Sequence, residues 1–343
     1  MFDLKFLTIF SILFGAGLVL FTNRLEFKGI KSLRIHYRRT LWLMLLGFAH
    51  AYLIWGGDIL VNYAICGMIV VLLRHHEPKK LLIIGLTVFS VASLLYIIVG
   101  LIFPSLDASR THDLYLMWSP SEELINEELA SFQGSWIEQL PGRIEHAVTM
   151  QVFIFLYTGW RAGGLMIIGM ALFKWGILTA QKSKKFYFRL TAACLTIGLI
   201  LVGYGLRTIV DSDFDMIYSF FFGSQFNYWG SLLISLGYIG LVMICVKMNI
   251  LLPLKKALRA VGQTALTNYL MQSIICSVIF YGHGFGLIGK IDRWEQVIIV
   301  SGILFFQIIL SIIWLKNFKY GPFEWAWRSL TYWKMQPIKL KVQ

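Results

Sequence analysis

The sequence has few charged residues for its length. Of its 343 residues, 14% are Asp, Glu, Lys or Arg, whereas 57% are hydrophobic and the mean hydropathy is +0.69. A water-soluble domain needs roughly 25% charged residues to cover its surface, so this class of protein is excluded. The composition instead predicts an all-α fold, a polytopic bundle of transmembrane helices.

Cysteine is scarce, and several catalytic motifs are missing. The four cysteines lie inside apolar segments without Cys-x-x-Cys spacing, which is typical of small buried hydrophobic residues and not of a disulfide framework or a metal site. No zinc-protease, phosphate-loop, serine-hydrolase or dinucleotide-binding motif stands where its mechanism would need it. We therefore expect no metal, and any function must come from isolated polar residues in the apolar segments.

About nine apolar segments are present, and most are long enough to cross a bilayer as helices. They lie near 5–22, 41–55, 58–73, 81–103, 149–174, 189–206, 228–246, 262–282 and 296–315. We expect three regions along the chain. They are a four-span part at 1–103, an extracytoplasmic acidic loop with an amphipathic helix at 104–148, and a five-span part with a cytoplasmic aromatic and basic tail at 149–343.

The charges are sorted between alternate connections. Basic residues concentrate in five of them, which hold 24 of the 31 Lys and Arg: 23–40, 74–80, 174–189, 247–260 and 316–343. The intervening segment 104–148 carries eight acidic residues against two arginines. The positive-inside rule then predicts a multi-pass protein of the bacterial plasma membrane, with the basic loops and the C-terminus in the cytoplasm.

The net charge of +13 follows the same pattern. It is spread along the membrane normal and does not form one basic face or tail, so we expect no nucleic-acid partner. Anionic lipids of the bilayer are the expected partner of the basic loops.

The same orientation has a consequence for the start of the chain. If 23–40 is cytoplasmic, the first segment runs from outside to inside and Met1 lies on the outer face. Either a further span precedes Met1 in the complete protein, or this is a natural nine-span protein.

The candidate catalytic residues are His50 and Asp58. They flank Gly56-Gly57, a turn tight enough to make an antiparallel hairpin of the second and third segments. A carboxylate beside an imidazole fixes its tautomer and raises its basicity, as a general base requires. Asn62 lies one helical turn beyond Asp58 and is a candidate binding residue. The structural alternative is a hydrogen bond that locks the hairpin, with Asp58 capping the third helix.

Three further polar sites lie in or next to apolar segments. Arg161 stands near the middle of one, where it requires a partner, and serves either as a structural counter-charge to Asp58 or as an anion-binding residue. Asn268 and Gln272 form a polar stripe that either joins helices or lines a polar cleft. Arg38 and Arg39 offer a phosphate site, although the positive-inside bias explains their charge equally well.

Several runs of the sequence resemble the YeiB-like family of bacterial integral membrane proteins (domain of unknown function 418). They are FLTIFSILFGAGLVLF at 6–21, the pair Arg38-Arg39, GFAHAYLIWGGDILVNYAICG at 47–67, RAGGLMIIGMALFKWG at 161–176, GQTALTNYLMQS at 262–273 and YGPFEWAWRSLTYWKMQPI at 320–338. Members of the family usually begin with one more span that bears an Asp-x-x-Arg-Gly-like motif. The resemblance implies that this chain lacks that first span.

The family is considered similar to transmembrane acyltransferases. This implies transfer of an acyl group from cytoplasmic acyl-CoA, such as acetyl-CoA, to a small-molecule or cell-envelope acceptor. His50 would be the base or acyl relay and Asp58 its orienting partner. Arg38, Arg39 and Arg161 would contact phosphate or the acyl carbonyl. The alternatives are a small-solute transporter and a non-enzymatic membrane scaffold or regulator.

Overall fold

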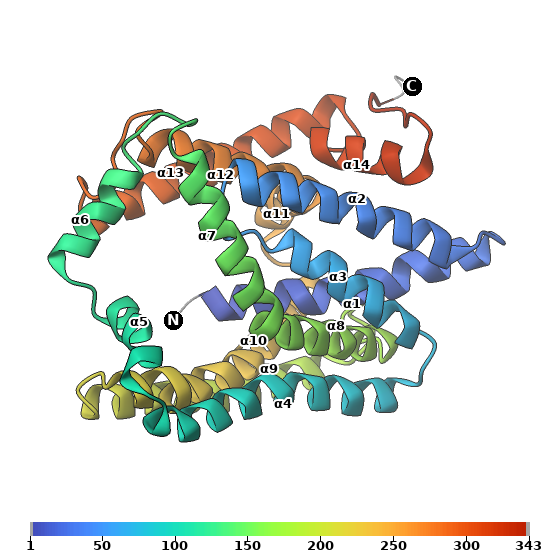
Figure 1. The fold of residues 1–343 in the computed structure, drawn as a ribbon. Helices are drawn as coiled ribbons and strands as arrows, with labels where there is room; N and C mark the ends of the chain where they lie inside the picture. The colour runs from blue at the N-terminus through green and yellow to red at the C-terminus, as the bar shows by residue number, and fades with distance from the viewer. Residues whose placement is uncertain (1–2, 341–343) are drawn as a thin grey trace. The chain divides into compact units, whose positions relative to one another are not determined.

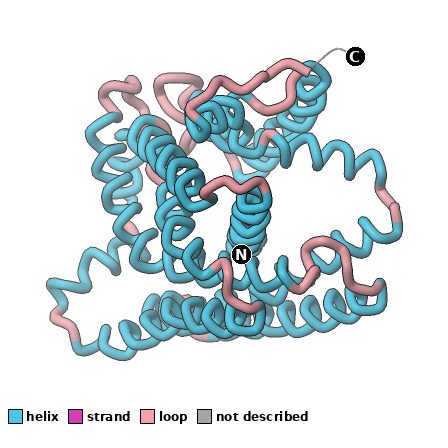
Figure 2. Tube along the Cα trace, turned by 90° about the vertical axis from the view of Figure 1, so that its right-hand side faces the viewer, coloured by secondary structure: helices cyan, strands magenta, loops and turns pink. Residues whose placement is uncertain are grey.

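The computed structural model describes residues 3–340, which form helices joined by loops (Figures 1 and 2). The helices are α1 (Asp3–Phe27), α2 (Ser32–Leu53), α3 (Leu60–Val70), α4 (Pro78–Ile102), α5 (Ala108–Trp118), α6 (Glu122–Ser131), α7 (Leu140–Phe153), α8 (Gly159–Lys174), α9 (Lys184–Asp211), α10 (Ser224–Met248), α11 (Leu252–Gln263), α12 (Ala265–Phe280), α13 (Arg293–Asn317) and α14 (Pro322–Tyr332). Within the described residues the only β pairing is an isolated bridge between Phe318 and Lys339. The predicted all-α class is confirmed. Met1 lies outside the described residues.

Within the described part of the chain, five helices are long and apolar enough to cross a membrane. They span Leu4–Phe27, Pro78–Ser105, Lys184–Asp211, Tyr218–Met248 and Arg293–Asn317. Two shorter apolar helices, Leu60–Leu73 and Ala265–Phe280, fall at two of the other predicted segments. These helices support the prediction of a helical membrane bundle.

One of the predicted spans differs in detail from a single straight helix. The segment expected at 149–174 is divided among the end of α7, a π-helical turn at Ile154–Thr158 and α8. A second π-helical turn at Tyr218–Gly223 precedes α10. Hydrophobicity alone does not reveal such turns, because the apolar pattern continues through them.

The acidic segment is helical over much of its length. The predicted amphipathic helix is present as α6, with Leu124 and Ile125 exposed on its surface. Helix α5 precedes it and is not predicted by the sequence pattern, and it also exposes apolar side chains such as Met117. The topological side of this segment stays a prediction.

The described chain folds as two compact units, each assembled from three separate stretches of sequence. Among the described residues, unit 1 contains 3–33, 65–121 and 154–250, and unit 2 contains 34–64, 122–153 and 251–340. The division into the regions 1–103, 104–148 and 149–343 concerns membrane topology and stays a prediction.

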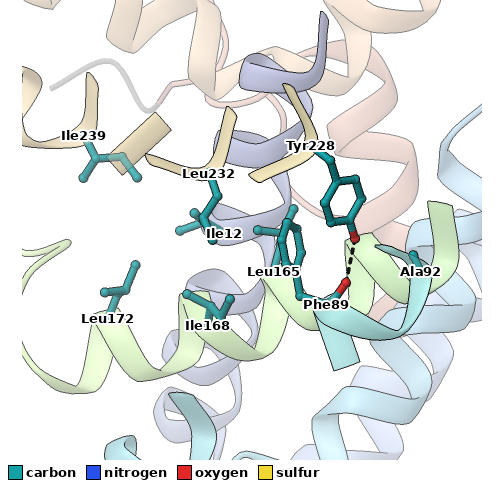
Figure 3. Close-up of a cluster of buried hydrophobic side chains, with 9 residues drawn as sticks. All are labelled: Ile12, Phe89, Ala92, Leu165, Ile168, Leu172, Tyr228, Leu232 and Ile239. Carbon is teal, nitrogen blue, oxygen red and sulfur yellow. Dashed lines mark hydrogen bonds between the residues drawn. The ribbon is translucent and has the colours of Figure 1, made fainter. Parts of the chain in front are cut away.

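Unit 1 has a tightly packed core of helices α1, α4, α8, α9 and α10. Figure 3 shows its central cluster, in which the Tyr228 hydroxyl donates a hydrogen bond of 2.7 Å to the Phe89 carbonyl. Helices α1 and α8 approach closely at Gly15 and Gly169. A Cβ at Gly169 would clash with the Ile12 carbonyl oxygen, so only glycine permits this contact.

Unit 2 packs α12 against α13 and α14. Glu324 of α14 accepts hydrogen bonds from the Thr267 backbone N–H (3.0 Å) and hydroxyl (2.6 Å) in the first turn of α12. A carboxylate at this end of a helix satisfies a free N–H group and meets the positive end of the helix dipole. This contact ties the C-terminal helix to the start of α12.

Candidate functional site

The turn between α2 and α3 forms the base of the candidate site. The N–H groups of Ile54 and Trp55 both donate to the His50 carbonyl at 2.9 Å, which ends α2. Both carboxylate oxygens of Asp58 lie 2.9 Å from the Leu60 N–H at the start of α3. Asp58 therefore caps α3, which is the capping part of the structural alternative.

The same turn brings His50 and Asp58 together. The distance between His50 Nδ1 and Asp58 Oδ1 is 3.6 Å, and both side chains are fully buried. Within the described residues, neither imidazole nitrogen has a hydrogen-bond partner. A carboxylate facing Nδ1 favours the tautomer with its proton on Nδ1, so Nε2 retains the lone pair needed to accept a proton.

Two aromatic rings enclose the imidazole. The ring centroid of Tyr269, on α12, lies 5.0 Å from that of His50, and the ring of Trp55 lies 6.3 Å away at an edge-on angle. The Tyr269 hydroxyl also accepts a hydrogen bond of 3.4 Å from the Ile59 N–H. Tyr269 thus contacts both sides of the α2–α3 turn.

The end of α2 is fixed by two side chains from the acidic segment. The Leu53 carbonyl accepts hydrogen bonds from Trp136 Nε1 at 3.0 Å and from Arg143 Nη1 at 3.1 Å. These donors satisfy a carbonyl that the end of the helix leaves without an intrahelical partner. Gly56 packs against α7, where a Cβ would meet the His146 ring at 2.7 Å. The position of His50 therefore depends on segment 122–153.

A cavity of about 570 Å³ adjoins these rings. Trp55 and Tyr269 line it on the side next to His50, and Ile54 together with residues of α12, the following loop and α13 forms the rest. This volume is within the range of ligand pockets, which is about 300–1,000 Å³. A ligand in the cavity would be separated from the imidazole by the two aromatic rings.

The two residues of the predicted polar stripe on α12 differ in role: one joins helices and the other lines the cavity. The side-chain amide of Asn268 donates from Nδ2 to the Ser311 hydroxyl of α13 at 3.0 Å, and Gln307 Nε2 donates to the Asn268 carbonyl at 2.8 Å. Asn268 therefore joins two helices. Gln272, one turn further along α12, lines the cavity.

The remaining binding candidates in unit 2 are Asn62, Arg38 and Arg39. Asn62 is buried in the first turn of α3. The guanidinium of Arg38 lies 5.2 Å from the Trp333 ring and donates a hydrogen bond of 2.6 Å to the Thr331 carbonyl. The guanidinium of Arg39 lies 4.5 Å from the ring of Trp327. Both arginines are therefore held by the C-terminal aromatic segment through cation–π contacts.

Arg161 belongs to unit 1 and is buried there. Its Nη2 donates to the hydroxyls of Thr8 (2.6 Å) and Ser231 (2.9 Å), and the guanidinium lies 5.0 Å from the Tyr228 ring. These contacts join α1, α8 and α10. The hypothesis that Arg161 is a counter-charge to Asp58 stays a prediction.

Burial and charge near the C-terminal end of α12 affect two titratable groups. Burial, followed by the positive charge of Arg143, lowers the pKa of His283. Burial also lowers the pKa of Arg143, whereas Tyr281 opposes that shift. His283 therefore favours its neutral form in the folded protein. Within the described residues, no three His, Cys, Asp or Glu side chains cluster as a metal site would require.

Sequence reasoning missed Trp55, Tyr269, Trp136 and Arg143. Tyr269 follows Asn268 directly in the run at 262–273 that carries the family resemblance, and Trp55 precedes the Gly-Gly turn. Arg143 is one of only two arginines in an acidic segment. These signals draw attention to the residues, but none of them reveals the contact with α2.

The fold and site define a helical membrane-bundle protein with a buried His–Asp pair beside a cavity. Residues 172–334 match DUF418, a protein family of unknown function. The chain is 32% identical to the uncharacterized protein YeiB of Escherichia coli (strain K12), over 96% of this chain and 82% of that protein. It is 30% identical to the uncharacterized protein YxaH of Bacillus subtilis (strain 168), over 99% of this chain and 82% of that protein. The chain therefore belongs to the YeiB-like DUF418 family.

A further relative is an uncharacterized 39.9 kDa protein encoded in the amylase 3′ region of Bacillus acidopullulyticus. It is 27% identical over 99% of this chain and 83% of its own length. No solved structure matches the chain.

Proposed function

We propose that the protein is a membrane-bound acyltransferase that moves an acyl group from cytoplasmic acyl-CoA to an extracytoplasmic acceptor. The observation that carries the proposal is the buried His50–Asp58 pair at 3.6 Å, with Nε2 of His50 outside any hydrogen bond in the described chain. A buried histidine oriented by a carboxylate and placed next to a ligand-sized cavity is typical of a general base.

The proposed step transfers the acyl group from the thioester to an acceptor hydroxyl. The hydroxyl oxygen attacks the thioester carbonyl while His50 Nε2 takes the hydroxyl proton. The C–O bond forms, the C–S bond breaks, and the thiolate receives the proton as it leaves. The carboxylate of Asp58 stabilises the imidazolium that exists between these proton transfers.

Arg38 and Arg39 are the proposed contacts for the phosphates of the donor. Their guanidinium groups are already held against Trp333 and Trp327, so less side-chain entropy is lost when a phosphate binds. The positive-inside rule supports a cytoplasmic position for this end of α2, where acyl-CoA is available.

The test measures thiol release from acetyl-CoA by the purified protein in nanodiscs, with a membrane extract as the source of acceptor. We expect His50→Gln to lower turnover by about 10²–10⁴-fold, because the general base is lost. His112→Gln is the matched control, since His112 is an exposed histidine of α5. Equal turnover in the two variants would sink the proposed role of His50.

Asp58 offers a sharper comparison, because its cap and its charge can be separated. Asn caps helices about as well as Asp, so Asp58→Asn keeps the bond to Leu60 and removes the charge beside His50. Asp58→Ala removes both. We expect both variants to lose turnover, but only Asp58→Ala to lower the thermal stability.

A second candidate function is small-solute transport through unit 1. Two observations favour it: the π-helical turns at Ile154–Thr158 and Tyr218–Gly223, and the buried cation Arg161 between helices. Interrupted helices and buried charges are features of transporter binding sites. Proteoliposomes loaded with radiolabelled acetate or phosphate test this function. Flux that is absent from both the native protein and its Arg161→Lys variant would contradict it.

A further inference from the structure

The cavity beside His50 is built on one face of α12. The lining side chains of this helix recur at intervals of three and four residues, which places them in one stripe. They are Tyr269, Gln272, Ser273, Cys276, Ser277 and Phe280. From its first member to its last, the stripe is about 17 Å long at a rise of about 1.5 Å per residue. One end contacts His50, and the other lies at the end of α12.

The polar groups of the stripe can form hydrogen bonds with an uncharged ligand. The Ser277 hydroxyl donates to the Ile274 carbonyl at 2.9 Å and the Ser273 hydroxyl to the Tyr269 carbonyl at 3.4 Å, so both oxygens still have lone pairs that can accept hydrogen bonds. The side-chain amide of Gln272 forms no hydrogen bond with another residue of the described chain. An amide can both donate and accept, as can a ligand hydroxyl.

The remaining walls are mostly apolar, and Gln296 of α13 adds one uncharged polar side chain. Ile54, Leu287, Ile288 and Ile291 face the cavity together with the aromatic rings. None of the described residues that line it is charged. A charged ligand group would lose its hydration here without gaining an opposite charge, which is costly. The lining therefore selects against anionic and cationic ligands.

We infer that this cavity binds an uncharged amphiphile, with its hydroxyl-bearing head among Gln272, Ser273 and Ser277 and its apolar part against the isoleucine and leucine walls. That this ligand is the acyl acceptor rests on the proposed function. That the cavity binds an uncharged amphiphile does not depend on the proposed function. Tyr269 and Trp55 separate the bound head from His50, so proton transfer to the imidazole requires movement of at least one of these rings.

Cys276 provides a native reporter, because it lines the cavity and is partly exposed. The experiment follows alkylation of each cysteine by N-ethylmaleimide, resolved by mass spectrometry of peptides, in protein reconstituted in nanodiscs. Three probes share a ten-carbon chain and differ in head charge: monodecanoylglycerol (neutral), decyl phosphate (anionic) and decyltrimethylammonium (cationic). Cys194 and Cys245 of unit 1 are internal controls.

We expect monodecanoylglycerol to slow alkylation of Cys276 by about tenfold at ten times its dissociation constant. The charged probes should leave that rate unchanged, and the rates at Cys194 and Cys245 should stay constant throughout. Gln272→Leu should weaken the protection by about fivefold through loss of a hydrogen bond. Gln263→Leu, the same change at an exposed position outside the cavity, should preserve it.

Equal protection by the three probes, or none by the neutral one, would overturn the inference. Protection of all three partly exposed cysteines would do the same, because it would indicate a general effect on the bilayer. Selective protection without thiol release would leave the binding inference standing while the acyltransferase proposal failed. Thiol release without protection would overturn the inference, support the enzyme and place its acceptor elsewhere.

Discussion

Two buried polar sites lie in surroundings of opposite kinds. Arg161 in unit 1 is surrounded by packed side chains and hydroxyl groups of three helices, with Phe89 and Tyr228 against its guanidinium. His50 in unit 2 is equally buried, yet it lies behind two rings that border a cavity. Burial alone therefore does not separate structural from chemical roles.

The difference between these sites is the space beside them. A polar group whose partners come from several helices lowers the free energy of the fold, since each contact holds two elements together. A polar group whose nitrogen has no hydrogen-bond partner contributes less to stability, and it can exchange protons with a ligand once the intervening rings move. We therefore expect substitutions at Arg161 to affect stability and substitutions at His50 to affect turnover.

The largest expected effect is on turnover at His50. His50→Gln should raise the activation free energy by about 2.7–5.4 kcal/mol, the equivalent of a 10²–10⁴-fold slower reaction. Its thermal unfolding temperature should stay close to that of the native protein. Thiol-release kinetics check the loss of turnover, and thermal unfolding of the same sample checks the unchanged stability. A large loss of stability would remove the contrast with Arg161.

The second effect concerns the stability of unit 1. Arg161→Met should lower the free energy of unfolding by about 3 kcal/mol, because the Thr8 and Ser231 hydroxyls each lose a charged donor. Arg161→Lys keeps the charge but loses the planar guanidinium group. Its free energy of unfolding should therefore lie between those of the native protein and Arg161→Met. Unfolding in detergent, followed by tryptophan fluorescence, measures both. An unchanged free energy in Arg161→Met would show that these hydroxyl contacts add little.

A third, smaller effect tests how rigid the core of unit 1 is. Gly169→Ala places a Cβ against the Ile12 carbonyl oxygen and should destabilise by about 1–3 kcal/mol. Gly17→Ala is the matched control, because nothing lies within 4 Å of its Cβ. That variant should be neutral or more stable, since alanine favours helices over glycine. The same unfolding assay ranks the two.

The fourth comparison lies within one helix of unit 2. Asn268→Ala should destabilise by about 0.6–1.7 kcal/mol, because it removes a hydrogen bond between α12 and α13. Gln272→Ala, one turn away, should leave stability unchanged, because its amide faces the cavity. Equal losses in the unfolding assay would indicate that both amides join helices.

The smallest effect is a pH dependence near the cavity. Because the pKa of His283 is lowered in the folded state, the folded protein takes up this proton less readily than the unfolded chain. The free energy of unfolding should therefore be unaffected by this group above the ordinary histidine pKa of about 6.5, and it should decline as the pH falls below that value. His283→Gln should reduce this decline. Unfolding temperatures measured between about pH 5 and 8 provide the check.

Local features of the molecule could be predicted from sequence. Apolar runs predict helices because the driving force depends on neighbouring residues, and His50 and Asp58 are separated by only a short turn. The contacts that complete the site could not be predicted. Tyr269 reaches the Ile59 N–H from 210 residues away, and Arg143 reaches the Leu53 carbonyl from 90 residues away. No periodicity in the sequence encodes such distant pairs.

The polar stripe shows the same limit on a smaller scale. Helical spacing places Asn268 and Gln272 on related faces of α12, and both roles considered for them are compatible with that spacing. Only the position of Ser311 on α13 gives Asn268 its partner. The division between a helix contact and a cavity wall depends on tertiary packing, which this spacing does not contain.

The interleaving of the two units has a consequence for how the protein is made. Helix α1 packs against α8 and α10, but α10 ends at Met248. At about 5–20 residues per second, the ribosome needs on the order of 10–40 s to synthesise the chain between them. During that time α1 lies in the bilayer without its final neighbours. Membrane insertion of this protein therefore cannot complete the packing of α1 in chain order, because the partner of its glycine-lined face is made only once translation has passed α10.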